Sequence, residues 1–159
     1  AIVLMAIAFV SLSITMSYSA GRSADGMWQV KTVELSDAYF DEILAMRFDE
    51  NSAQGGVPAC SISTTACSVG AAFDDGETRA EFDDVDDYDG LDETPPRDVN
   101  DGVRAGYAGY RVEIDVTYPT AAQVTAYGLD DTTDAKVIIA RIHPPGRDPV
   151  TFSAYRGNF

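Results

Sequence analysis

Basic residues are scarce in this chain. Its 159 residues include 11 lysines and arginines against 26 aspartates and glutamates, a formal net charge of −15 at pH 7. An acidic surface of this kind repels nucleic acid and anionic lipid headgroups, so we expect neither as a partner. The length suits one globular domain together with a helical segment.

Histidine and cysteine are equally scarce. His143 is the one histidine, and Cys60 and Cys67 are the two cysteines. A structural zinc site usually takes four ligands from these residue types, so the chain has too few of them. We therefore expect His143 to be an ordinary surface residue.

The motifs of common catalytic sites are missing too. The sequence contains no GxSxG, no HExxH and no glycine-rich phosphate loop between a strand and a helix. Carboxylates are so numerous that no single pair stands out as an acid–base couple. We therefore expect the protein not to be an enzyme.

Charge is absent from residues 1–20, AIVLMAIAFVSLSITMSYSA. A helix of about 20 residues spans roughly 30 Å, the thickness of a bilayer's hydrocarbon core. Four interpretations are open: a cleaved signal peptide, a buried core helix, a single-span anchor, and a helix that begins in the membrane and ends inside a polymer. No basic residue precedes the run, and it is apolar on all sides, which disfavours the first two.

Helical periodicity continues after this run, in residues 27–48. Leu35, Tyr39 and Ile43 fall on one side of the predicted helix, which is apolar. The opposite side is charged and carries Lys31, Glu34, Asp41 and Glu42. Between the two helical parts, Gly21 and Gly26 flank a polar insert and weaken the helix there, by about 1 kcal/mol each relative to alanine.

The two cysteines lie seven residues apart in a loop of small residues, VPACSISTTACSVG. A short disulfide between Cys60 and Cys67 is the favoured interpretation, since an external compartment permits oxidation. Two unrelated free thiols are the alternative.

Residues 73–93 carry eleven acidic side chains and one base, Arg79. A run of this kind is usually disordered. However, Phe82, Val85, Tyr88 and Leu91 recur every three residues, which predicts an ordered loop with its apolar side packed and its acids outward.

The same stretch is a candidate cation-binding site. Calcium binds six to eight oxygen ligands, typically carboxylates and backbone carbonyls. The candidate ligands precede Gly90 and are Asp84, Asp86, Asp87 and Asp89. The EF-hand pattern is absent, and a solvated acidic face is the competing interpretation.

Strand patterns dominate the last third of the chain. Residues 107–118 alternate between apolar and polar side chains, and 136–143 and 150–155 read as two further strands separated by a turn. Residues 123–128 fit a short strand or a turn. We expect an α+β fold: a long helix divided into an apolar half (1–22) and an amphipathic half (23–48), a loop region (49–104), and an antiparallel sheet of three to four strands (105–159). Residues 23–159 would form the globular head.

This order of elements resembles that of the type IV pilins and pseudopilins. Three stretches, RSADGMWQVKTVELSDAYFDEILAMRFDE, FDDVDDYDGL and TFSAYRGNF, are similar to the D-type minor pilins of mannose-sensitive haemagglutinin pili. Such pilins have a basic leader, a peptidase site and a mature start like FTLIE, whose glutamate pairs with a neighbouring subunit. The sequence begins inside the apolar run and has no acid before Asp25, so we expect further residues upstream of Ala1.

The resemblance implies a structural subunit of an extracellular filament, anchored in the inner membrane before assembly. Its partners would be further copies of itself and other pilins. Helix packing in the filament core would involve the large apolar residues Ile2, Leu4, Ile7, Phe9, Val10, Leu12 and Ile14. The segment from Gly21 to Gly26 would be the hinge where the helix bends or melts locally.

Two other functions stay open. One is a calcium-dependent surface binding domain on a single-span anchor, with Asp84 to Asp89 for the ion and Tyr88 or Tyr107 for ligand contact. The other is a pseudopilin of a secretion system, which has the same fold and differs mainly in its partners.

Overall fold

The computed structural model describes residues 26–53, 55–61, 65–69 and 76–159. The chain divides into two compact units, Ala1–Glu34 and Leu35–Phe159. In the first unit, residues 26–34 are helical. The predicted filament-core residues between Ile2 and Ile14, and Gly21 of the predicted hinge, lie outside the described residues. Gly26 is the first described residue of the helix.

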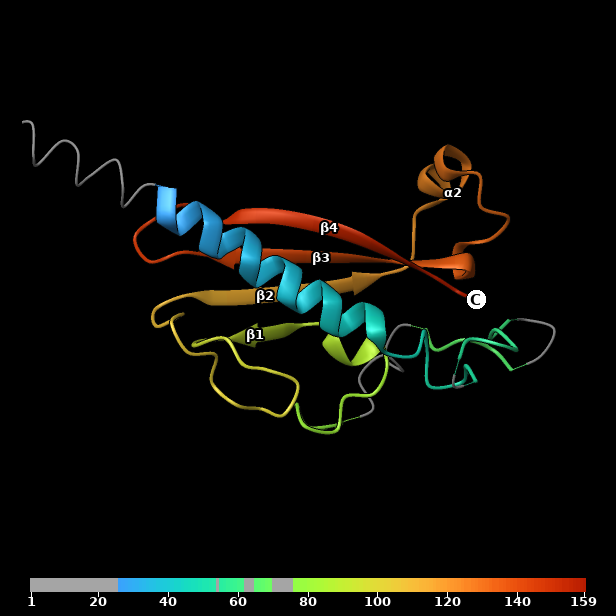
Figure 1. Cartoon of the computed structure of the whole chain (residues 1–159). Helices are drawn as coiled ribbons and strands as arrows, with labels where there is room; N and C mark the ends of the chain where they lie inside the picture. The colour runs from blue at the N-terminus through green and yellow to red at the C-terminus, as the bar shows by residue number, and fades with distance from the viewer. Residues whose placement is uncertain (1–25, 54, 62–64, 70–75) are drawn as a thin grey trace, which may run out of the picture. The chain divides into compact units, whose positions relative to one another are not determined.

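The second unit contains a four-stranded antiparallel sheet in the order β1-β2-β3-β4 (Figure 1). The strands are β1 (Leu91–Glu93), β2 (Arg111–Thr117), β3 (Ala135–His143) and β4 (Val150–Gly157). In β2 the burial alternates, with Val112, Ile114 and Val116 buried and their neighbours more exposed. Period-two burial is typical of a sheet covered on one face, which is what the sequence predicts for this segment.

The last part of the long helix, residues 35–45, crosses one face of this sheet (Figure 1). Leu35, Tyr39 and Ile43 are fully buried there, as the helical periodicity predicts. They form one apolar core with sheet residues and with the acidic segment; its other buried members are Val85, Tyr88, Tyr110, Val112, Ile114, Val116, Ile138, Ala140 and Ile142. The α+β class and the antiparallel sheet are thus confirmed for the second unit.

The opposite face of the sheet carries several charged pairs. Arg111 pairs with Asp92 across the strands at 2.6 Å, and Arg141 pairs with Asp115. The Nε2 atom of His143 lies 2.6 Å from a carboxylate oxygen of Glu113, and the His143 side chain is 27% exposed. His143 is therefore a partly exposed residue of this face.

Two elements differ from the prediction. Strand β1 lies inside the segment 49–104, which was expected to be loop; its three residues are too few to show an alternating pattern. The segment 123–128 was predicted as a strand or turn, but residues 123–127 belong to the helix α2 (Ala121–Tyr127), and Gly128 is its C-terminal cap.

Helix α2 is capped at both of its ends. Thr120 and Gln123 form a capping box, in which each side chain bonds the other residue's backbone N–H. Gly128 follows the helix in the left-handed conformation, with φ 69°, which glycine adopts without steric cost. These caps stabilise a helix that buries none of its residues.

Among the helices that the structure describes, none has both the length and the apolar character needed to cross a membrane.

Candidate functional site: a buried ionic centre beside the disulfide

Lys136 stands at the inward-facing side of β3. It shares this side with Ile138, Ala140 and Ile142, which belong to the apolar core. The Lys136 side chain is fully buried, with no exposed area. A buried ammonium is costly unless it is paired and hydrogen-bonded, so its surroundings must supply acceptors.

Three oxygens from distant parts of the chain meet the Lys136 ammonium. Nζ donates to the backbone carbonyl of Phe48 at 2.6 Å and to Oδ2 of Asp49 at 3.3 Å. It also forms an ion pair with Oδ1 of Asp86. The aromatic rings of Phe48 and Tyr118 lie 4.4 and 5.6 Å from Nζ. Lys136 thus connects β3, to which it belongs, with the segment after the long helix and with the acidic segment. We call Lys136, Asp49, Asp84 and Asp86 the buried ionic centre.

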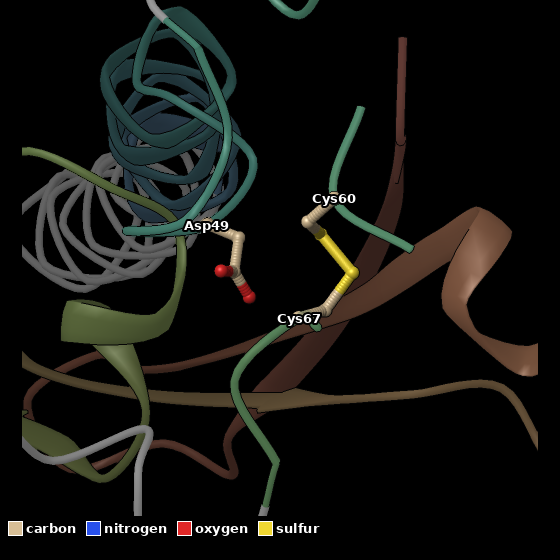
Figure 2. Close-up of side chains that lie close together, drawn as sticks. All are labelled: Asp49, Cys60 and Cys67. Atoms are coloured by element: carbon tan, nitrogen blue, oxygen red, sulfur yellow. A yellow bond between two sulfur atoms is a disulfide. The ribbon is translucent and has the colours of Figure 1, made fainter. Parts of the chain in front are cut away.

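Asp49 links this centre to the cysteine loop. Its Oδ1 accepts a hydrogen bond from the backbone N–H of Asn51 at 2.9 Å, and its Oδ2 accepts one from the N–H of Ser68 at 2.7 Å. Its carboxylate lies beside the Cys60–Cys67 disulfide (Figure 2). These two hydrogen bonds connect Asp49 to the segment that follows it and to the cysteine loop.

The predicted disulfide is present, with 5.0 Å between the Cα atoms of Cys60 and Cys67. Both cysteines are buried against Phe48 and Tyr118. The side-chain amide of Asn158, near the end of the sequence, donates to the carbonyls of Cys60 and Thr133, each at 2.9 Å. The cysteine loop is therefore tied to the segment before β3.

Asp84 and Asp86 add two more buried carboxyl groups. Oδ1 of Asp84 accepts from the Asp86 backbone N–H at 2.7 Å. Burial, aided by the Asp87 carboxylate, raises the pKa of Asp84 to about 6. Burial also raises the pKa of Asp86 to about 7, although Lys136 opposes the rise. The buried ionic centre therefore holds three carboxyl groups against one ammonium.

The carboxyl groups of the four predicted calcium ligands interact with different donors inside the protein. Oδ2 of Asp87 accepts from the backbone N–H groups of Asp83 and Asp84, and Oδ1 of Asp89 accepts from the N–H of Val116. Among the described residues, the acidic groups close enough to share an ion are Glu50, Asp83 and Asp84, and Glu77, Asp83 and Asp87. Neither group unites the four residues, and calcium binding stays a prediction.

The apolar spacing in the acidic segment predicts its packing well. Val85 and Tyr88 are fully buried, and Phe82 and Leu91 pack against the same core. A short 3-10 turn, η2 (Asp86–Tyr88), connects them. The suggestion that Tyr88 contacts a ligand is wrong, because its side chain is inside the core; Tyr107 is partly buried against that core.

A second polar network lies on the helix and contradicts one expectation. Glu42 was placed on the solvent side, but its side chain is only 7% exposed. It accepts hydrogen bonds from Arg79, from Arg104 at 2.7 Å and from the Tyr88 hydroxyl at 3.0 Å. Arg79 in turn donates to Glu93 at 2.9 Å.

Sequence reasoning missed Lys136 and Asp49 as members of a site. The burial of Lys136 could have been inferred from the sequence, because it occupies an inward-facing position in an apolar strand. The role of Asp49 could not be inferred from the sequence, because its partners Ser68 and Lys136 are 19 and 87 residues away.

Comparisons of this chain with protein-family models, with curated proteins and with solved structures find no match.

Proposed function

We propose that this chain is a structural subunit of an extracellular type IV pilus-like filament. It would be anchored in the inner membrane before assembly and polymerise through its N-terminal helix. The observation that supports the proposal most is the helix that packs residues 35–45 on one face of an antiparallel sheet. In the sequence this helix lies downstream of a run of 20 residues without a charge.

The uncharged run supplies the chemistry of assembly. An apolar helix exchanges lipid for the apolar surfaces of neighbouring helices at little cost in desolvation. Contacts between different surfaces of identical subunits propagate into open filaments when the rotation between neighbours does not close a ring. Further copies of the chain, and other pilins, are the partners that this mode of assembly requires.

Electron microscopy of material sheared from the cell surface tests the proposal. We expect thin filaments that are absent from a strain lacking this chain. In a main subunit, side-chain density in every repeat would match Trp28, Tyr39 and the Cys60–Cys67 loop. Filaments that contain the chain only rarely would assign it to a minor pilin. A chain that stays in the membrane fraction, with no filament dependent on it, would contradict the proposal.

The same experiment separates the two alternatives. A pseudopilin would leave surface filaments unchanged, while its loss would stop secretion. An anchored calcium-dependent domain would stay in the membrane fraction, and calcium would raise its melting temperature because a ligand that binds only the folded state stabilises it. Asp83→Asn would abolish that rise, since Asp83 belongs to both of the acidic groups.

A further inference from the structure

Lys136 and Asp86 bring an amine and a carboxyl group into direct contact inside the protein. Nζ of Lys136 pairs with Oδ1 of Asp86, and the exposed fractions of the two side chains are 0% and 4%. The other carboxyl oxygen, Oδ2, is buried and has no hydrogen-bond partner among the described residues. The rings of Phe48 and Tyr118 cover the ammonium, so the pair lies in apolar surroundings.

We propose that Lys136 and Asp86 condense into an intramolecular amide, with a bond between Nζ of Lys136 and Cγ of Asp86. The bond would join strand β3 to the η2 turn, 50 residues apart in the sequence. This modification does not depend on the proposed filament function.

The reaction consumes only the two side chains, and Asp49 relays a proton between them. Asp49, which accepts a hydrogen bond from Nζ, takes one proton from the ammonium. The nitrogen lone pair then attacks Cγ of Asp86, and one bond from Cγ to oxygen breaks with its electron pair on the oxygen. That oxygen leaves as water with two of the three ammonium protons, one of them relayed by Asp49. The amide keeps the third proton, and no atom is oxidised or reduced.

Three physical effects favour the condensation. A reacting pair held in place experiences an effective concentration that reaches on the order of 10⁵–10⁸ M in well-oriented intramolecular reactions. A buried ion pair also bears the desolvation cost of both ions, and a neutral amide removes that cost. The raised pKa of Asp86 acts in the same direction, since the neutral acid is a better electrophile than the carboxylate.

The geometry selects Asp86 rather than Asp49 as the acylating group. Asp49 lies farther from Nζ, at 3.3 Å, and the backbone N–H groups of Asn51 and Ser68 hold its carboxylate. Asp86 pairs with the lysine through one oxygen and leaves the other without a partner. Asp49 therefore serves as the proton acceptor.

Mass spectrometry of the full chain tests the bond directly. The folded, disulfide-bonded protein is denatured and reduced, and its intact mass is compared with the mass given by its sequence. We expect the main species to be lighter by one water molecule. Trypsin should then release a branched peptide in which residues 80–97 are joined to residues 112–141, since an acylated Lys136 is not cleaved.

Two variants provide matched controls. Lys136→Arg keeps the positive charge but offers no amine to condense, so it should show the full mass of its sequence. Asp86→Asn should form the same amide with loss of ammonia instead of water, so its product should have the same mass as the cross-linked parent. This second variant preserves the test if Lys136→Arg does not fold.

Two results would overturn the proposal. One is a folded, oxidised parent chain with its full sequence mass after reduction. The other is a loss of water without the branched peptide, as a succinimide at an Asp–Gly pair such as Asp89-Gly90 would produce.

Discussion

Asp86 holds one carboxylate oxygen against the Lys136 ammonium and keeps the other buried without a hydrogen-bond partner in the described part of the chain. Two more carboxyl groups, Asp49 and Asp84, are buried in the same centre. One ammonium does not neutralise three carboxylates, and unpaired buried charge is costly. Protonation of the least stabilised acids is therefore coupled to folding.

We expect the stability of the protein to fall as the pH rises through the titration of Asp84. Burial and the Asp87 carboxylate raise its pKa from 3.8 to about 6. Between these values the folded chain binds more protons than the unfolded chain, so this contribution is complete below 3.8 and is lost as the pH rises through about 6. It corresponds to at most about 3 kcal/mol. Urea unfolding at a series of pH values measures it.

Asp84→Asn is the matched control for this pH response. The amide oxygen still accepts the hydrogen bond from the Asp86 backbone N–H, but the group no longer titrates. The difference in unfolding free energy between parent and variant should therefore change across this pH range. Parallel curves for the two proteins would contradict the assignment to Asp84.

Much of the fold was predictable because it depends on local periodicity. Strand β2 alternates between apolar and polar residues, β3 is rich in apolar residues, and the helix that carries Leu35, Tyr39 and Ile43 shows a clear apolar face. Strand β1 was not predictable, because its three residues become a strand only by pairing with β2, where Leu91 lies opposite Ile114. Helix α2 had a readable signal in Thr120 and Gln123, whose spacing is that of a capping box.

Only parts of the buried ionic centre and its surroundings could be predicted from the sequence. The disulfide was the favoured of two interpretations of the cysteine loop, and a buried lysine could have been inferred from the position of Lys136 in its strand. Its partners could not, since Phe48 and Asp86 are 88 and 50 residues away in the sequence. Tertiary packing also placed Glu42 inside a network, although helical periodicity assigned it to the solvent side.

Replacing both cysteines, Cys60→Ser with Cys67→Ser, should lower stability. In the chain-entropy model, a disulfide that closes a loop of this size contributes about 2–3 kcal/mol. The melting temperature of the double variant should be lower than that of the parent, and a reductant should change only the parent. An unchanged melting temperature together with a free thiol in the parent would show that no bridge forms.

Glu42→Gln should strongly destabilise the head. Removing this charge leaves Arg104 and Arg79 with a weaker acceptor inside the protein, and breaking a buried ion pair costs about 3–5 kcal/mol. Asp41→Asn is the matched control, because Asp41 is exposed on the same helix and should change stability by less than about 0.5 kcal/mol. Urea unfolding compares the two, and equal effects would argue against the network.

Val10→Asp should prevent filament assembly if the apolar run forms the filament core. A charge at the centre of a membrane helix costs about 2.5–3.5 kcal/mol, and a packed helical bundle offers it no partner. Val10→Leu should assemble normally, and immunoblots of membrane fractions check that both variants are produced. Filaments of normal abundance from Val10→Asp would contradict a core role for this residue.

The hydrogen bond from Nζ of Lys136 to the Phe48 carbonyl also bears on how the domain resists a pulling force. Phe48 follows the end of the long helix, and β3 is paired with strands on both of its sides. This hydrogen bond therefore connects the end of the helix to a central strand of the sheet without passing along the chain between the helix and β2. A proteolytic cut in that intervening segment should therefore cause little change in the force at which the domain unfolds when the helix is pulled.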